Sequence, residues 1–90
     1  MKILIGASTI RDGQNLLRMI RPGVMAVDGV GRIWRTGDDW YQIMVPGERI
    51  ARDSGFDRAL VLGSDARTMA WVQMQVAPSM GGAGTELVVI

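Results

Sequence analysis

Residues 2–23, KILIGASTIRDGQNLLRMIRPG, contain the clearest strand and helix signals of the 90-residue chain. The apolar run over residues 2–7 is typical of a buried strand. Ser8 and Thr9 then each offer a helix N-cap, and Thr9 with Asp12 three residues later approximates a capping box. Apolar side chains recur at helical spacing until the Pro-Gly pair at 22–23, which predicts the end of the helix. This stretch therefore predicts a strand followed directly by an amphipathic helix.

The segments after residue 23 are typical of short strands joined by turns. Residues 24–27 and 32–35 flank Asp28-Gly29-Val30-Gly31, and a D-G pair between apolar runs predicts an antiparallel hairpin. A two-residue turn at Asp28-Gly29 and a four-residue loop both fit this spacing. Residues 40–45, WYQIMV, predict the next strand. Pro46-Gly47 is then expected to begin a short helix. The remaining predicted elements are the body of that helix over 49–54, ended by Gly55, a buried strand at 59–62, a long alternating strand at 68–76, a Pro/Gly loop at 77–84 and a last strand at 87–90.

Together these elements predict an α+β fold in a single domain over residues 1–90. The expected architecture is a small, mostly antiparallel sheet with two short helices, in the approximate order β-α-β-β-β-α-β-β-β. Residues 16–34 and 49–71 run alike, each as helix, turn, strand, Gly/Asp turn and strand. A degenerate internal duplication is one interpretation, and chance repetition of a common α+β unit is the other.

The composition excludes several kinds of functional site. The chain has no Cys and no His, so it can form no disulfide, Cys/His zinc site, thiol nucleophile or imidazole base. Ten basic side chains against nine acidic ones give a net charge of +1, unlike a protein that coats DNA. Residues 1–35 carry six basic and two acidic side chains, net +4, and residues 36–90 carry four basic and seven acidic, net −3. This asymmetry favours an acidic partner or head-to-tail self-association, unless folding averages it out.

No motif predicts catalysis or a cofactor. The turn at residues 6–8 follows a strand, where a nucleotide fold has its phosphate-binding turn. It lacks the glycines of the dinucleotide fingerprint, and a hairpin is expected after the helix in place of a parallel crossover. Asp38-Asp39 is a weak set of cation ligands, and such pairs are common in turns. We therefore expect no catalytic residue, no cofactor and no metal site.

Arg, Trp and Met are the residue types with most to offer a partner. Nine of the ten basic residues are Arg, and the chain has seven Met and three Trp. Trp and Arg dominate binding hot spots, and Met adapts to irregular surfaces. This composition predicts a non-enzymatic, cytoplasmic protein-binding module that forms a homodimer and has no membrane segment. The candidate partner-binding residues are Arg18, Arg21, Arg32, Trp34, Arg35, Trp40 and Tyr41.

A short chain without acid–base residues is typical of phage or mobile-element accessory proteins, which inhibit or scaffold a larger host complex. Residues 59–72, ALVLGSDARTMAWV, resemble the final hairpin of type I-F anti-CRISPR proteins, so an anti-CRISPR-like role is one form of this hypothesis. The stretch is too short to identify a family. The alternative function is nucleic-acid binding, because Arg and aromatic residues interleave over residues 32–41 like a stacking platform.

Overall fold

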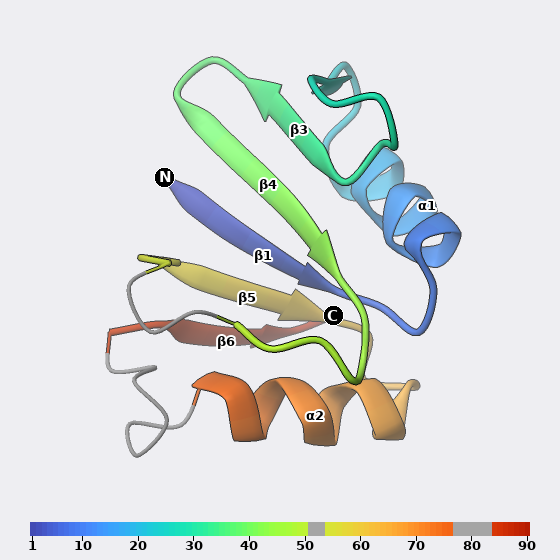
Figure 1. Cartoon of the computed structure of the whole chain (residues 1–90), viewed down its shortest axis with the longest axis vertical. Helices are drawn as coiled ribbons and strands as arrows, with labels where there is room; N and C mark the ends of the chain where they lie inside the picture. Colours follow the sequence, from blue (N-terminus) through green and yellow to red (C-terminus); the bar gives the residue numbers. More distant parts are fainter. Residues whose placement is uncertain (51–53, 77–83) are drawn as a thin grey trace.

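The strand and helix that open the chain form the centre of the fold. In the computed structural model, which describes residues 1–50, 54–76 and 84–90, β1 (Lys2–Gly6) leads into α1 (Ile10–Ile20) (Figure 1). Thr9 is the N-cap of α1, since its side-chain oxygen accepts a hydrogen bond of 3.0 Å from the Asp12 N–H. The strand and the helix are therefore confirmed, and of the two candidate caps it is Thr9 that caps the helix.

Six strands form one mixed sheet in the order β2-β3-β4-β1-β5-β6. β1 pairs in parallel with β4 and β5, and β5 pairs in parallel with β6, whereas β2–β3 and β3–β4 are antiparallel. The α+β class is confirmed, but the sheet is mixed and not mostly antiparallel. The expected absence of a parallel crossover is also wrong, because β4 returns parallel to β1 after α1 and the hairpin. The bounds of the other strands are Met25–Ala26 for β2, Ile33–Thr36 for β3, Asp39–Met44 for β4, Arg58–Val61 for β5 and Glu86–Val89 for β6.

The strand predicted over residues 68–76 is wrong, because this segment belongs to helix α2 (Ala66–Val76). Asp65 caps the helix: its carboxylate accepts hydrogen bonds from the Thr68 N–H at 3.2 Å and the Thr68 hydroxyl at 2.6 Å. Thr68 and Val72 are buried four residues apart, as on one face of a helix. The resemblance of residues 59–72 to a terminal hairpin therefore does not hold, since a strand, a turn and a helix occupy them.

Two further predictions change with the fold. Residues 48–50 and 54 are not helical, so the helix expected over 49–54 is wrong for its described part, and residues 51–53 lie outside the description. The predicted loop at 77–84 likewise lies almost entirely outside the described residues. The internal duplication is also wrong, because Trp34 lies in β3 whereas Trp71 lies in α2.

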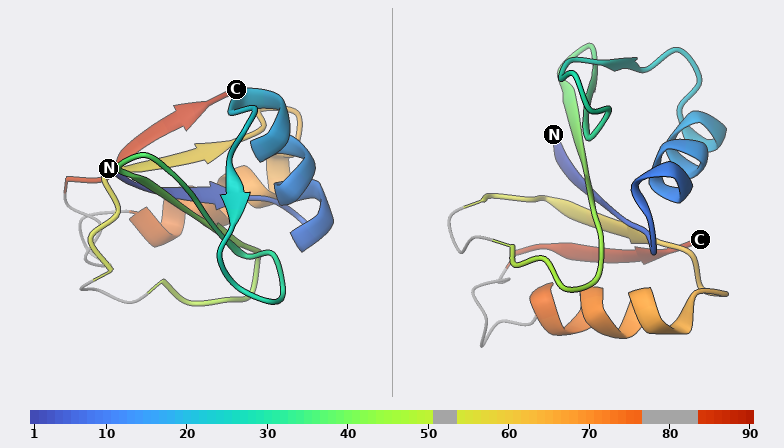
Figure 2. Two further views of the ribbon diagram at one scale, coloured as in Figure 1. Left: turned by 90° about the horizontal axis from the view of Figure 1, so that it is seen from above. Right: turned by 45° about the vertical axis from the view of Figure 1, so that its right-hand side comes forward.

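The two helices cover opposite faces of the sheet. α1 packs on β1 and β4, and α2 packs on β5 and β1 from the other side (Figure 2). Alternation along β1 divides the core, since Ile3 and Ile5 face α1 whereas Leu4 faces α2. Neither helix in the described part of the chain is long and apolar enough to cross a bilayer.

Glycine allows a close approach in both layers. A side chain at Gly13 of α1 would collide with Ile43 of β4. A side chain at Gly6 of β1 would collide with Val72 of α2. Each helix therefore lies directly against the sheet at one glycine.

Candidate functional site

Two of the predicted binding residues meet at the antiparallel end of the sheet. Arg35 in β3 lies between Trp40 in β4 and Met25 in β2 in the strand register. The next pair along the hairpin is Val27 with Ile33, joined by a hydrogen bond of 2.9 Å from the Val27 N–H to the Ile33 carbonyl. Residues directly opposite each other on neighbouring strands share a face of the sheet. We call the set formed by Met25, Val27, Ile33, Arg35 and Trp40 the open face.

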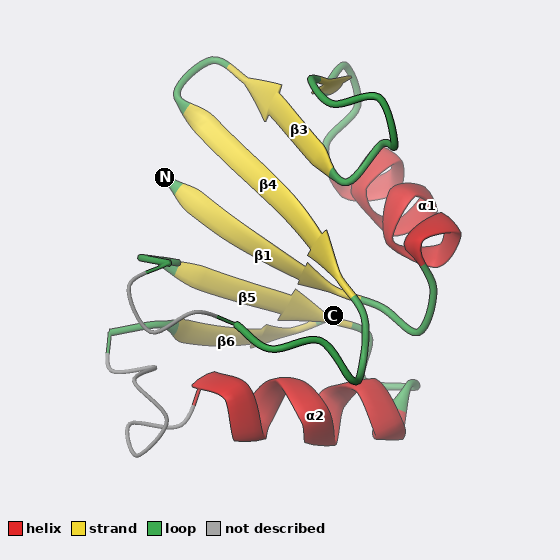
Figure 3. Cartoon of the chain, in the orientation of Figure 1, coloured by secondary structure: helices red, strands yellow, loops and turns green. Residues whose placement is uncertain are grey.

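Neither described helix covers the open face. α1 lies on the other side of β4, and α2 packs on β5 and β1 (Figure 3). Met25 is 71% exposed and Val27 is 56% exposed. Arg35 is exposed as well, while Ile33 and Trp40 are half-buried. Exposed apolar side chains grouped around a cation are typical of a surface that recognises another molecule.

The ring of Trp40 is held from the side of β1. The Lys2 ammonium nitrogen lies 4.6 Å from the centroid of the Trp40 ring and 4.8 Å from that of Phe56. The same ammonium donates a hydrogen bond to the Ser54 carbonyl. The Trp40 Nε1 atom is buried and has no hydrogen-bond partner in the described part of the chain. Among the described residues, cation–π contact and packing therefore hold the indole, and no hydrogen bond does.

Trp34 and Tyr41 point to the opposite face, into the core beneath α1. Trp34 is 7% exposed and Tyr41 is 4% exposed. The Trp34 Nε1 group donates a hydrogen bond of 2.7 Å to the Gly31 carbonyl, and the Arg18 guanidinium lies 5.3 Å from the ring centroid. Both rings are therefore core residues, and Arg18 stacks on the outside of this core.

Arg21 pairs with a carboxylate on the same side as Tyr41. Its Nη2 atom lies 3.4 Å from Asp39 Oδ2. Burial raises the pKa of the Tyr41 hydroxyl, an effect that the Arg21 charge opposes and the Asp39 charge reinforces. Arg21 thus belongs to the α1 side of the sheet.

Arg32 is also paired. Its guanidinium forms an ion pair with Glu48 and donates a second hydrogen bond to the Ile43 carbonyl. Burial acts to raise the pKa of the Glu48 carboxyl, but the hydrogen bonds from Arg32 and the Val45 N–H, with the Arg32 charge, lower that pKa overall. Arg32 therefore ties the hairpin to the segment after β4.

The cations of residues 1–35 are divided between the two faces. Arg18 and Arg21 lie on the α1 side, whereas Arg35 lies on the open face and Lys2 contacts the ring of Trp40 there. The Arg35 guanidinium forms no ion pair within the described ranges. A nucleic-acid groove needs several cations along one track beside stacking rings. This division does not favour such a groove.

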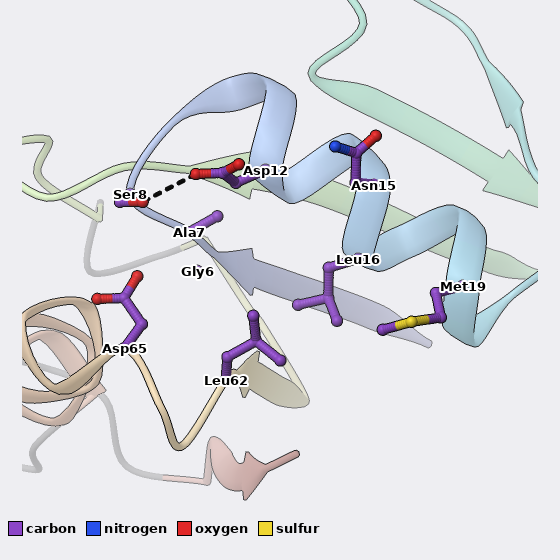
Figure 4. Close-up of a pocket in the computed structure, with 9 residues that line it drawn as sticks. All are labelled: Gly6, Ala7, Ser8, Asp12, Asn15, Leu16, Met19, Leu62 and Asp65. Atoms are coloured by element: carbon purple, nitrogen blue, oxygen red, sulfur yellow. Dashed lines mark hydrogen bonds between the residues drawn. The ribbon is translucent and has the colours of Figure 1, made fainter.

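A pocket of about 240 Å³ opens elsewhere, where β1 and β5 end side by side (Figure 4). The turn at residues 6–8 lines one part of it, α1 lines a second, and the turn between β5 and α2 lines a third. In the sequence, this turn stands out only because it follows a strand. The grouping of α1 and Asp65 around the same space is not visible in the sequence, because it depends on the order of the strands.

Met25, Val27 and Ile33 are members of the open face that were not among the predicted binding residues. The signal that could have found them is alternation, because Met25 and Val27 flank Ala26, and Ile33 and Arg35 flank Trp34. The register of the hairpin was needed to bring both sets to one face.

Comparisons of the chain with protein-family models, with curated proteins and with solved structures gave no match. We therefore infer function from the geometry of this chain alone.

Proposed function

We propose that the chain is a protein-recognition module that binds its partner through the open face without catalysing a reaction. The observation that carries this proposal is the row in which Met25, Arg35 and Trp40 lie side by side across β2, β3 and β4. Trp and Arg are the residues that contribute most often to binding hot spots, and Met adapts its shape to a partner.

The side chains of the open face define the surface that fits it. Arg35 forms no ion pair within the described residues, so a partner carboxylate would give it a bidentate contact. Met25 and Val27 would bury their exposed side chains against apolar groups around that carboxylate. The proposed partner is therefore a protein surface with an acidic side chain in apolar surroundings, on a larger assembly that is inhibited or scaffolded.

A different protein fits this face better than a second copy of the chain. The open face contains no carboxylate. A two-fold pairing of open faces would place two Arg35 guanidinium groups in one interface without a counter-charge. The homodimer, the cytoplasmic location and the phage or mobile-element origin stay predictions from composition.

Affinity capture with two matched variants tests the proposal. The variant M25D/R35E changes the open face, and the control M74D/R67E makes the same charge change on α2, where Met74 is 62% exposed and Arg67 is exposed. We expect a protein that wild type captures from source-cell lysate to be lost with M25D/R35E and kept with M74D/R67E.

Equal capture by both variants would refute the open face as the binding surface. Loss of all capture after nuclease treatment, with affinity that falls steeply as salt rises, would instead identify the nucleic-acid alternative. Circular dichroism of each variant confirms that it is folded.

A further inference from the structure

The pocket beside the turn at residues 6–8 is independent of the open face and lies at a distinctive point of the topology. β1 and β5 are parallel neighbours whose carboxyl ends lie side by side. α1 follows β1 onto one face of the sheet, and α2 follows β5 onto the other. The carboxyl ends of parallel strands form a ligand-binding crevice where successive helices take opposite faces in this way.

One end of the pocket is polar and acidic. Asp12 of α1 and Asp65 before α2 approach it from different segments, next to Ser8 (Figure 4). The Ser8 hydroxyl donates a hydrogen bond of 3.0 Å to Asp12 Oδ2. Asp12 Oδ1 accepts no hydrogen bond from the described residues, and no basic side chain is among the residues that line the pocket.

The other end of the pocket is apolar. Leu16 is buried and Leu62 is half-buried, and both line this end (Figure 4). Met19, which is 68% exposed, lies beside them at the rim. A pocket of this kind fits a molecule that has a polar head and a short apolar chain.

We propose that this pocket binds a small organic ammonium ion. The ammonium head lies between Asp12 and Asp65, and the aliphatic chain lies against Leu16, Leu62 and Met19. A phosphate or carboxylate would face two carboxylates with no cation to offset them. The volume of about 240 Å³ is below the roughly 300–1,000 Å³ of sites for drug-sized ligands, so the ligand has only a few carbon atoms.

Three ligands of one shape test the charge requirement. n-Butylammonium, 1-butanol and butyrate are titrated into the ¹⁵N-labelled full chain while amide chemical shifts are recorded. We expect saturable shifts with n-butylammonium that centre on residues 6–8, 12–19 and 62–65. Binding of 1-butanol and butyrate is expected to be at least tenfold weaker. Equal binding of the three ligands, or butylammonium shifts that centre elsewhere, would overturn the proposal.

Two carboxylate variants test the position of the head. D12N leaves Thr9 as the N-cap of α1. D65N replaces the residue that caps α2, where Asn caps about as well as Asp, so both helices keep a cap. We expect each variant to weaken n-butylammonium binding at least fivefold, and the double variant to abolish saturation. D38N removes an exposed carboxylate that does not line the pocket and serves as the control. A loss with D38N as large as that with D12N contradicts the proposed head position.

Discussion

The two faces of the β2–β3–β4 end of the sheet carry the same residue types in different environments. On the α1 side, Trp34 is 7% exposed, its N–H is bonded to a carbonyl, and Arg18 stacks on its ring. On the open face, Trp40 is half-buried, its N–H has no partner in the described chain, and Arg35 beside it is exposed. Side chains alternate between the two faces along each strand, so Trp34 and its neighbour Arg35 in β3 lie on opposite faces and differ in role. The face of the sheet on which a residue lies, and not its type, therefore decides whether it belongs to the core or to the proposed binding surface.

The largest loss of stability is expected when one of the two indole rings is removed, Trp34 on the α1 side or Trp40 on the open face. W34A should lower the free energy of unfolding by about 3–5 kcal/mol, because it empties a buried site. W40A should cost about 1–2 kcal/mol, because its ring is half-buried and contributes mainly packing and the contact with Lys2. Urea denaturation measures both values. A cost for W40A equal to that for W34A would remove the distinction between the two faces.

A smaller loss of stability is expected on the α1 side when one methyl group is added at Gly13. Ala is favoured over Gly in a helix by about 1 kcal/mol. G13A should nevertheless destabilise the protein by about 1–3 kcal/mol, because the new side chain collides with Ile43. Thermal unfolding with the exposed-site control N15A checks the sign. A rise in the melting temperature of G13A would show that α1 does not lie against β4 as described.

The ion pair between Arg32 and Glu48, a kind of contact that Arg35 does not make within the described residues, can be tested through pH. Because the pKa of Glu48 is lowered in the folded state, its ion pair adds stability above the ordinary pKa of about 4.5 and loses it as the pH falls through the lower folded value. E48Q should therefore cost about 1 kcal/mol or less at pH 7, and less at pH 3 than at pH 7. Melting temperatures of both proteins at the two pH values measure this difference. An equal cost at both pH values would contradict the ionic contribution.

The smallest effect on stability is expected at the open face itself. R35A should change the free energy of unfolding by less than about 0.5 kcal/mol, because the side chain is exposed and has no ion pair among the described residues. Urea denaturation beside R32A, which loses the pair with Glu48, provides the contrast. A large cost for R35A would mean that this residue is structural.

The elements that sequence analysis predicted correctly are those set by local signals. The cap at Thr9 and the Pro-Gly stop at 22–23 lie within a few residues of the helix that they bound. The hairpin follows from the turn that begins at Asp28, whose carboxylate accepts hydrogen bonds from the N–H groups of Arg32 and Ile33. Such contacts join residues that are close together in the sequence, so they do not depend on the rest of the fold.

Helix α2 was missed because its sequence fits two periods. Its apolar residues alternate, but they also place Thr68, Val72 and Val76 on one helical face. A connection between parallel strands β5 and β6 requires a crossover, which is usually a helix, and that pairing is not visible in the sequence. The Asp65 cap was the local signal that could have decided between them.

The binding surface could not be predicted fully either, because it too depends on strand pairing that is not visible in the sequence. Arg35 and Trp40 were found by residue type, but so were Trp34 and Tyr41, which are core residues. Only the pairing of β3 with β4 shows which of these side chains share a face.

The most direct test of the open face is site-specific photo-cross-linking in the source cells. A photoreactive phenylalanine analogue replaces Met25 on the open face or Met74 on α2, since the two are similarly exposed at 71% and 62%. We expect a cross-linked protein adduct from position 25, lost when R35E is added, and none from position 74. The same adduct from position 74, or none from position 25, would contradict it.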